Sequence, residues 1–457
     1  MTDIALELTR SALTCIGEDA RALQTLAFTG AGELPSAYAV TDFASAAMAI
    51  AAFSVAELAE HLGGTRRSVI IDRRLASFWL GSSVRPIGWA LPPLWDPLAG
   101  DYPTSDGWIR LHTNAPHHRA AAQHVLGPHA DKASMTRAVA HWRKRDLETA
   151  IVEAGGCAAE MRSAQQWADH PQGRAVASEP LARIVVRDRA PSRGFTAPPA
   201  RPLAGVRVLD LTRVLAGPVA SRFLAGYGAD VLRIDPPDWN EPGVVPEVTL
   251  GKRCARLDLK TAAGRATFEE LLSTTDIFLH GYRPDALDGL GYDEPTRRKL
   301  APGLIDVGLS AYGWSGPWSL RRGFDSLVQM STGIAEAGMR WKAAERPVPL
   351  PAQALDHTTG YLMAATAVRG LTRRLVDGYA SEGRLSLART AKLLVDKAAS
   401  NSSSSLLAET AADVAAAVEK TAWGEARRLI PPVAIEGVPM KWVYPAGNLG
   451  SAEPRWK

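Results

Sequence analysis

Short apolar runs alternate with helix-like segments most clearly in the second half of the chain. Residues 206–211 and 231–234 are apolar runs of strand type, and between them Pro218 and Gly226 mark places where a helix begins and ends. Strand, helix and strand within roughly thirty residues is the size of one right-handed crossover unit. The alternation continues to residue 375. It predicts an open α/β sheet of the doubly wound, Rossmann-like type.

The first half of the chain has a different pattern. An alanine-rich stretch begins near Thr41 or Asp42, either of which is a suitable N-cap, and ends at two glycines, Gly63 and Gly64. Strand and helix signals then mix within a compact α+β unit. We therefore divide the chain into a helical lead-in and linker segment (1–103), a small α+β domain (104–190), a proline-rich linker (191–203), the Rossmann-like domain (204–375) and a C-terminal helical and wrapping segment (376–457).

Composition excludes several classes of protein. The chain has 457 residues, of which 46% are hydrophobic, and a net charge of +4 with scattered basic residues, which argues against a nucleic-acid partner. The apolar stretch 43–56 is shorter than the ~20 residues that span a bilayer, and it is flanked by Asp42 and Glu57. We expect a buried helix there and no membrane partner. The cysteines are three and isolated, which favours a reducing cytoplasm.

Histidines are concentrated in the predicted small domain. His112, His117, His118 and His124 have no cysteines or carboxylates at ligand spacing, so we predict no metal site. We interpret them as solvated side chains or as side chains whose hydrogen bonds are satisfied locally.

Four motifs stand in order between residues 203 and 373: LDLTRVLAGP with GADVLRID, GKRCARLDLKT, GYRPDALDGLGYD, and SAYGWSGPW followed by GFDSLVQ. In sequence and in order they resemble the family III CoA-transferases, a family that includes formyl-CoA transferase, carnitine CoA-transferase and α-methylacyl-CoA racemase. The segment 1–103 resembles the part of the family after its catalytic aspartate. The segment 104–190 resembles the family's small domain, which normally follows that aspartate, so the domain order here is rearranged.

The resemblance implies an active site. The family's catalytic aspartate opens a helix in a sequence similar to LDHTTG, which places it at Asp356. The implied activity moves CoA between an acyl-CoA and a carboxylic acid through an aspartyl-CoA thioester. The residues implied to bind coenzyme A are Val214, Ala216, Lys252, Arg253, Leu259, Lys260, Arg283 and Arg322. Family members are interlocked homodimers, which implies a homodimer here.

Two other functions remain open. A racemase or isomerase of acyl-CoA needs an acid and a base on opposite faces of the α-carbon, but the racemase histidine matches Phe324 here, which disfavours racemisation. His357, beside Asp356, is a weak substitute because adjacent helical residues point in different directions. The other possibility is a non-catalytic acyl-CoA-binding paralogue. Leu215 replaces a glutamine of formyl-CoA transferases, which makes formate and oxalate poor substrates.

Two further aspartates have structural interpretations. Asp325 is expected to bond to backbone in a turn. The segments that begin at Asp42 and Asp356 echo each other, because each leads into a small-residue helix, a short apolar stretch and a second helix. We interpret Asp42 as an N-cap in a duplicate of the Asp356 helix.

Overall fold

A computed structural model describes residues 3–17, 20–190, 195–397 and 405–457 of the chain. Residues 191–194 of the predicted linker lie outside the described residues.

The centre of the molecule is a seven-stranded sheet with the order β10-β9-β8-β11-β12-β13-β7. All neighbouring strands are parallel except β7, which pairs antiparallel with β13. The strands are β7 (Arg183–Arg189), β8 (Arg207–Leu211), β9 (Asp230–Asp235), β10 (Lys252–Arg256), β11 (Ile277–His280), β12 (Ile305–Ser310) and β13 (Tyr379–Ser386). The predicted α/β class with a large parallel sheet is confirmed, and the sheet extends beyond the range 204–375 predicted for that domain.

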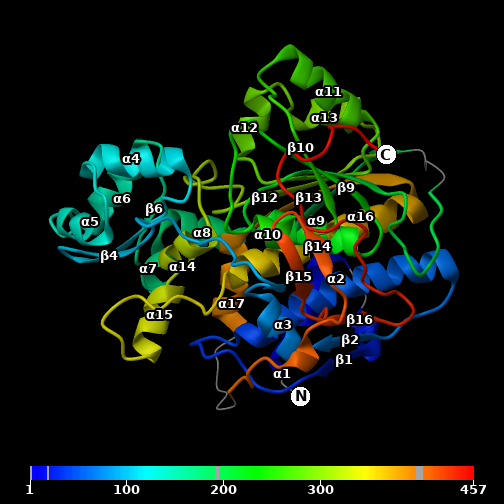
Figure 1. Cartoon of the computed structure of the whole chain (residues 1–457), viewed down its shortest axis with the longest axis horizontal. Helices are drawn as coiled ribbons and strands as arrows, with labels where there is room; N and C mark the ends of the chain where they lie inside the picture. Colours follow the sequence, from blue (N-terminus) through cyan, green and yellow to red (C-terminus); the bar gives the residue numbers. More distant parts are fainter. Residues whose placement is uncertain (1–2, 18–19, 191–194, 398–404) are drawn as a thin grey trace.

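Helices cover both faces of this sheet, so its inner strands are continuously buried. On one face Val208 and Leu279 share a core with α9 (Ala216–Gly226) and α16 (Ala354–Asp377). On the other face Leu209 and Phe278 pack with α11, α12 and α13. Those helices span Ala262–Ser273, Pro284–Gly289 and Glu294–Leu300 and form the upper lobe of Figure 1. Alternate residues of one strand thus serve two cores.

Helix α2 (Val40–Gly63) packs against α16 beneath the sheet. Both helices have 24 residues, and both end at a glycine in the left-handed conformation. The bounds predicted from Thr41 or Asp42 to the double glycine agree with α2. The helix is long and apolar enough to cross a membrane, but the predicted burial is confirmed, because 94% of its most apolar window is buried inside the protein. Its N-cap is Ala39, so the N-cap role predicted for Asp42 is wrong.

The surroundings of α2 come from both ends of the chain. Its neighbours are α1 (Asp3–Ile16), α3 (Arg73–Trp79) and a three-stranded sheet of β1 (Leu26–Thr29), β2 (Val69–Asp72) and β16 (Val433–Ile435). The short helix η1 (Ala20–Thr25) packs against α1. The strand and the helix that follow the double glycine at Gly63 and Gly64 are thus β2 and α3.

The small α+β unit forms the left lobe of Figure 1. It contains β4 (Gly100–Thr104), β5 (Gly107–Leu111), α4 (Pro116–Leu126), α5 (Lys132–Val139), α6 (Lys144–Glu153), β6 (Ala158–Glu160), α7 (Ala164–Asp169) and α8 (Pro171–Ser178). Cys157 and Ala159 share a small core with Leu327 and Met330 of α14 (Asp325–Ser331). The unit therefore docks directly beside the stretch that precedes Asp356.

The C-terminal segment is less helical than predicted. After β13 it has α17 (Leu387–Lys397), a short η2 (Ala411–Asp413) and the strands β14 (Glu419–Thr421), β15 (Gly424–Arg428) and β16. β15 pairs with β3 (Val84–Pro86), and β16 pairs with β2, so this segment wraps onto the N-terminal part of the chain. The predicted wrapping is confirmed. Helical periodicity fails here because strand pairing with distant segments decides the conformation.

Candidate active site

A cavity lies where the parallel strands β8, β11 and β12 end. Its volume is about 370 Å³, and the loops that follow these strands line it at 211–216, 281–283 and 309–311. β8 is the first strand of this unit in the chain, with β9 on one side and β11 on the other. The cavity therefore opens at the point where the strand order reverses, which is the usual ligand site of open α/β sheets.

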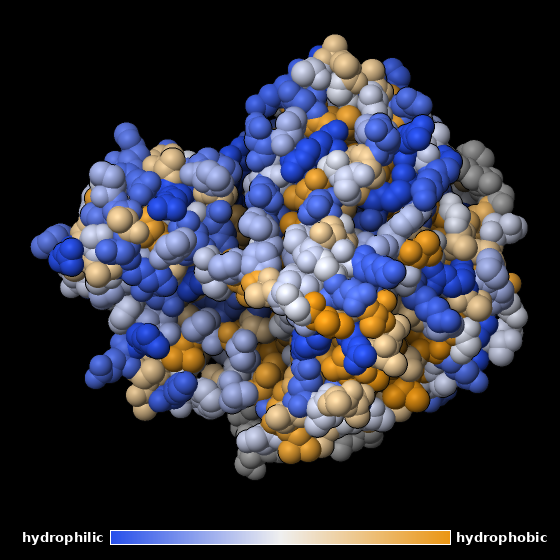
Figure 2. Space-filling view, viewed as in Figure 1, coloured by the Kyte–Doolittle hydropathy of each residue, from blue (hydrophilic) through white to orange (hydrophobic). Residues whose placement is uncertain are grey.

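The remaining walls of the cavity come from distant parts of the chain. His117 and His118 enter from α4 of the small unit, Arg321 to Phe324 come from the segment before α14, and Asp356 enters from the first turn of α16. Figure 2 shows the surface hollowed between the left-hand lobe, which is the small unit, and the body of the molecule. The cavity thus needs both halves of the chain.

The loop after β8 has a strained backbone. Val214 has a φ of 63°, a left-handed conformation that a β-branched residue rarely adopts. Its amide donates to the Glu241 carboxylate at 2.8 Å, and the Trp239 indole donates to the same carboxylate at 3.0 Å. Strain of this kind persists only where neighbouring contacts impose it, and it is concentrated at ligand sites.

Two glycines allow the elements around this loop to approach closely. A Cβ on Gly360 of α16 would lie 2.3 Å from the carbonyl oxygen of Ala216, and one on Gly217 would lie 2.2 Å from the Thr212 side chain. Gly360 is one helical turn after Asp356. The small-residue content of α16 therefore lets its first turn press against the loop and brings Asp356 to the cavity.

Asp356 itself is held through its backbone. Its amide donates to the carboxylate of Asp325 at 2.9 Å. The N-cap of α16 is Gln353, so the prediction that Asp356 caps the helix was wrong by three residues; the carboxyl lies inside the first turn, where the helix dipole favours an anion. The expected bond from Asp325 to backbone is confirmed, although Asp325 begins α14 and does not lie in a turn.

The electrostatic environment keeps both carboxyls unusually basic. Burial raises the pKa of Asp356 well above its ordinary value, and the charge of Asp325 raises it further. Burial also raises the pKa of Asp325, to about 6, although hydrogen bonds from Gln329 and from the amide of Asp356 oppose the shift. Asp356 is 8% exposed, so it faces the cavity from a largely dry position.

Arginines supply the positive charge around the cavity. Arg213 stacks between the rings of Trp239 and Tyr282, at 4.7 and 4.8 Å from their centroids. Arg283 is partly exposed and lies 3.6 Å from Asp285. Arg322 donates to the carbonyl of Gly155, and among the described residues it forms no ion pair. Arg283 and Arg322 are thus placed to meet an anionic ligand at the mouth.

The interpretation of the histidines as solvated or locally satisfied is wrong for two of them. His112 and His118 are buried, and neither ring nitrogen of His118 has a hydrogen-bond partner among the described residues. Burial lowers the pKa of His118 to about 3, with His117 and Arg322 acting in the same direction, so the ring is neutral. His118 packs edge-on against Phe324, with ring centroids 5.7 Å apart. A neutral imidazole with open nitrogens therefore borders the cavity that Asp356 enters.

Residues 203–434 match the model of CoA-transferase family III, which is just over half of the chain. The chain belongs to the family III CoA-transferases. Among curated relatives of this family III chain, the acetyl-coenzyme A transferase nodX of Hypoxylon pulicicidum is 34% identical over 206 residues, which are 44% of this chain and 34% of that protein. The succinyl-CoA:glutarate CoA-transferase of Mus musculus is 33% identical over 195 residues, 39% of this chain and 43% of that one.

A third relative also has a solved structure. The probable fatty acyl-CoA transferase of Mycobacterium tuberculosis is 32% identical over 199 residues, 40% of this chain and 50% of that protein. Its crystal structure superposes with a TM-score of 0.39 and 29% identity, covering 43% of this chain and 58% of the other. In these alignments the chain covers about half or less of each relative's length.

The family III fold brings together five of the nine residues that the resemblance singled out. Asp356, Val214, Ala216, Arg283 and Arg322 line one cavity. Their roles stay predictions, but their proximity is a property of the structure.

The other four predicted residues, Lys252, Arg253, Leu259 and Lys260, do not line it in the described part of the chain. Lys252 points into the interior, where its ammonium lies 3.2 Å from Asp210. Arg253 pairs with Asp230 at 3.0 Å, Leu259 packs in the core beside α11, and Lys260 is an exposed side chain. Lys252 and Arg253 lie in β10, and Leu259 and Lys260 follow it in the chain. β10 is the edge strand beyond β9, so it is further from the point where the strand order reverses.

Sequence reasoning did not propose Arg213, His117, His118 or Tyr282 as parts of the site. Arg213 lies beside Val214 in the strand-to-helix loop, so its position was a usable signal. No signal of that kind marks the histidines, because α4 reaches the cavity only through the docking of the small unit on α14.

Proposed function

We propose that this chain transfers CoA between an acyl-CoA and a carboxylic acid, and that Asp356 is its nucleophile. The observation that carries the proposal is a buried carboxyl in the first turn of α16, facing a cavity at the strand-order reversal in a family III chain. We also propose that the central sheet is of the doubly wound, Rossmann-like type. The helices packed on both of its faces support this.

The chemistry balances without a redox step or a net proton. The Asp356 carboxylate attacks the thioester carbonyl, the carbon–sulfur bond breaks, and a mixed anhydride and CoA thiolate form. The thiolate then attacks the aspartyl carbonyl and releases the first carboxylate, which leaves an aspartyl-CoA thioester. The incoming carboxylate attacks the aspartyl carbonyl of this thioester, the carbon–sulfur bond breaks, and a second mixed anhydride and CoA thiolate form. The thiolate then attacks the acyl carbonyl of this anhydride, which gives the new acyl-CoA and returns the Asp356 carboxylate. Burial excludes the water that would hydrolyse these intermediates.

CoA is a substrate in this proposal, and the chain's own groups account for its binding. Arg283 and Arg322 at the mouth would hold phosphates, and the loop residues Val214 and Ala216 would contact the rest of the molecule through their backbone. The amides of Ala216 and Gly217 at the start of α9 would be donors for the oxyanions of the tetrahedral intermediates, whereas the first amides of α16 already donate to Asp325 and Ala352.

Trapping tests the assignment. The protein is incubated with acyl-CoA and then treated with hydroxylamine or borohydride, and the modified residue is located by mass spectrometry. We expect the label on Asp356, none in Asp356→Asn, and normal labelling in Asp377→Asn, whose exposed carboxyl ends the same helix. Binding of acyl-CoA without label on Asp356 would contradict the proposal and favour the non-catalytic paralogue.

A second candidate has one observation in its favour. His118 and Asp356 border the same cavity, and a neutral imidazole can carry a proton to or from the α-carbon of an acyl-CoA. His357 does not serve this purpose, because it is fully buried and is not among the residues that line the cavity. Wash-in of deuterium at the α-carbon, without any acceptor acid, separates this isomerase function from CoA transfer.

The predicted homodimer and cytoplasmic location remain part of the proposal. In this chain the small unit and the helix that carries Asp356 meet at one cavity. Sedimentation of the purified protein will show whether a second chain associates with it.

A further inference from the structure

A side chamber of about 210 Å³ adjoins the cavity that Asp356 enters. Val214, Trp239 and Phe324 border both spaces, so the two spaces meet at these residues. The far walls are formed by residues 93–96 of the linker segment and 240–244 of the loop after β9. Phe324 immediately precedes Asp325, whose carboxylate binds the Asp356 amide, and this places the chamber next to the reacting group.

The walls of the chamber are aromatic and held in place. His112 stacks on Phe324 with ring centroids 3.7 Å apart and an interplanar angle of 16°. Trp95 meets His112 edge-on at 5.9 Å, and the guanidinium of Arg110 lies over the other side of Trp95 at 4.9 Å. Such contacts fix each ring, so the chamber is a preformed slot with aromatic walls, which it combines with the polar residues Asp96, Asn114, Asn240 and Glu241.

The charged groups that border the chamber are acidic and already paired. Asp96 lies 3.2 Å from Arg119 and accepts the Thr113 hydroxyl at 2.7 Å. Glu241 binds Arg233, the Trp239 indole and the Val214 amide. No lysine or arginine lines the chamber in the described part of the chain.

The imidazole at the chamber wall adds no positive charge either. Burial lowers the pKa of His112 well below its ordinary value, with His118 and Arg110 acting in the same direction, so the ring is neutral. A carboxylate inside the chamber would meet two acidic neighbours and no free cation, which is unfavourable in a partly dry site.

We propose that this side chamber takes the acyl group of the acyl-CoA and selects an uncharged, bulky apolar group, aromatic or branched. The inference rests on the proposed CoA transfer at Asp356 and deepens it. An apolar cavity of about 150 Å³ holds a benzene-sized molecule, so a chamber of 210 Å³ has room for a phenyl ring and a short chain. A dicarboxylic acyl group, with a second carboxylate at its far end, is excluded.

Binding of CoA thioethers tests the chamber independently of transfer, because a thioether cannot react. Calorimetry with the full chain compares CoA, S-phenethyl-CoA and S-carboxypropyl-CoA. We expect S-phenethyl-CoA to bind about tenfold or more tighter than CoA, and S-carboxypropyl-CoA to bind no tighter than CoA. Equal or tighter binding of the carboxypropyl thioether overturns the proposal.

Two variants fill the chamber from opposite walls, Val244→Phe and Ala115→Leu. Each should abolish the preference for the phenethyl group and leave the affinity for CoA unchanged. Val418→Phe, at an exposed position, is the matched control and should keep the preference. Thermal melting identifies a variant that does not fold. If one of the two variants fails to fold, the other still tests the chamber. If both fold and both retain the preference, the chamber is not the acyl site.

The outcomes also separate this inference from the proposed function. A phenethyl preference that these variants remove, without any label on Asp356 from a phenylalkanoyl-CoA, supports the chamber and overturns transfer. Label on Asp356 without any preference overturns the chamber alone.

Discussion

At the scale of single residues, Asp42 of α2 and Asp356 of α16 occupy the same position in similar helices, but their neighbours carry opposite charges. Asp42 and Asp356 are each the third residue of a 24-residue helix. Asp42 is fully buried, and one of its oxygens accepts two bonds from Arg73, at 2.9 and 2.7 Å. Asp356 has a second carboxyl, Asp325, as its neighbour and borders a cavity. An arginine-paired carboxylate is a weak nucleophile, so only the second helix retains the environment that transfer needs.

Asp325→Asn should move the pH profile of CoA transfer. The nucleophile is a carboxylate, so the rate falls as pH drops through the raised pKa of Asp356. Removing the charge of Asp325 lowers that pKa, because the charge is one of the two causes that raise it. The acid limb therefore shifts to lower pH, while the asparagine oxygen still accepts the Asp356 amide. Steady-state rates across pH measure the shift, with Asp377→Asn as control. An unmoved acid limb would show that Asp325 does not tune the nucleophile.

Arg322→Gln should weaken the binding of CoA. Arg322 borders the cavity and forms no ion pair among the described residues, so its charge is available to a phosphate. Loss of one charged hydrogen bond raises the Kd about tenfold or more. Calorimetric titration with CoA measures the change. Lys260→Gln is the matched comparison, because Lys260 is exposed and does not border the cavity. An equal effect of both substitutions would mean that CoA extends along the loop after β10.

At the scale of elements, the site depends on how closely α16 approaches α9 and the loop before it. Gly360 faces the carbonyl oxygen of Ala216 and the side chain of Val219, and it allows contact at backbone distance. Core packing is dense, so an added methyl group at such a point must move one of the two elements. The first turn of α16, with Asp356, would move with it.

Gly360→Ala is expected to destabilise the protein despite the better helix propensity of alanine. The new Cβ would lie 2.3 Å from the Ala216 carbonyl oxygen, and overpacking of this kind costs about 1–3 kcal/mol. Urea unfolding measures the loss. Gly289→Ala is the control, because nothing lies within 4 Å of a Cβ at that position in α12. If Gly360→Ala were as stable as the control, the close approach would not hold α16 in place.

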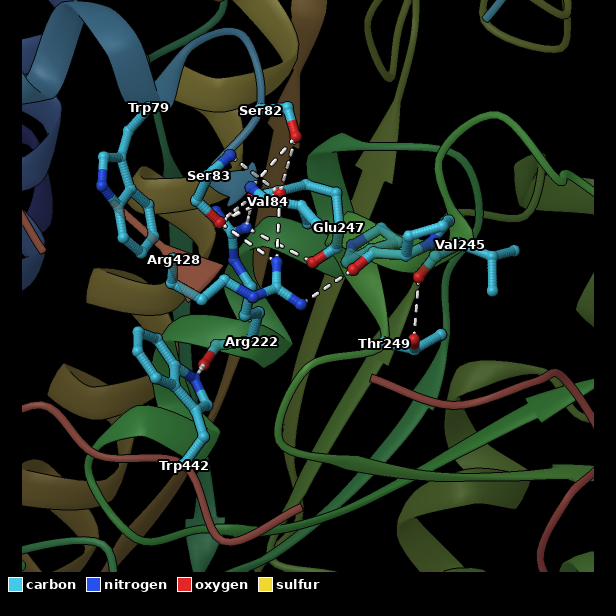
Figure 3. A network of polar contacts seen from close by, with 12 residues as sticks. Trp79, Ser82, Ser83, Val84, Arg222, Val245, Glu247, Thr249, Arg428 and Trp442 are labelled. Atoms are coloured by element: carbon cyan, nitrogen blue, oxygen red, sulfur yellow. Dashed lines mark hydrogen bonds and ion pairs between the residues drawn. The ribbon is translucent and has the colours of Figure 1, made fainter. Parts of the chain in front are cut away.

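At the scale of the whole molecule, a buried charge network joins three distant parts of the chain. The carboxylate of Glu247, in α10 (Val245–Val248), pairs with Arg222 of α9 and with Arg428 of β15, and it accepts bonds from Ser83. Figure 3 shows these side chains converging, with Trp79 and Trp442 beside Arg222. The network ties the N-terminal segment and the wrapping C-terminal segment to the central sheet domain.

Glu247→Ala should lower the free energy of unfolding by about 3–5 kcal/mol, because it leaves the buried Arg222 guanidinium without its carboxylate and removes one of the two carboxylates that pair with Arg428. Urea unfolding measures the loss, and Glu345→Ala, at an exposed position, should stay within about 0.5 kcal/mol of the parent. A loss no larger than that of Glu345→Ala would show that the network does not hold the segments together.

The pKa of Glu247 also makes the free energy of unfolding depend on pH. Burial alone raises the pKa of Glu247, but Arg222, Arg428 and the Ser83 hydroxyl outweigh it and bring the pKa to about 2. A folded-state pKa below the unfolded value of about 4.3 contributes stability above that pH. The contribution is lost as pH falls from about 4.3 towards 2. Chemical unfolding at several pH values should show this decline in the parent and a smaller one in Glu247→Ala.

Local patterns in the sequence determined strands β8 to β12 of the central sheet, most helices and the position of the loop after β8. The apolar runs at 206–211 and 277–279 are strands because both of their faces are buried, and Thr261 caps α11 as its residue type indicates. Motif order likewise placed Asp356, Val214, Ala216, Arg283 and Arg322 among the candidates that one cavity unites. These features depend on residues a few positions apart.

Only the tertiary structure decided which charged and aromatic side chains face that cavity. Lys252 turns inward to Asp210, while His118 and the ring of Trp95 come from the preceding half of the chain to lie beside Phe324 and the chamber. The reason is physical: periodicity reports which face of an element is buried, but the partner that a polar side chain meets is set by packing between segments hundreds of residues apart. The order of domains in the chain did not reveal that they would enclose one site.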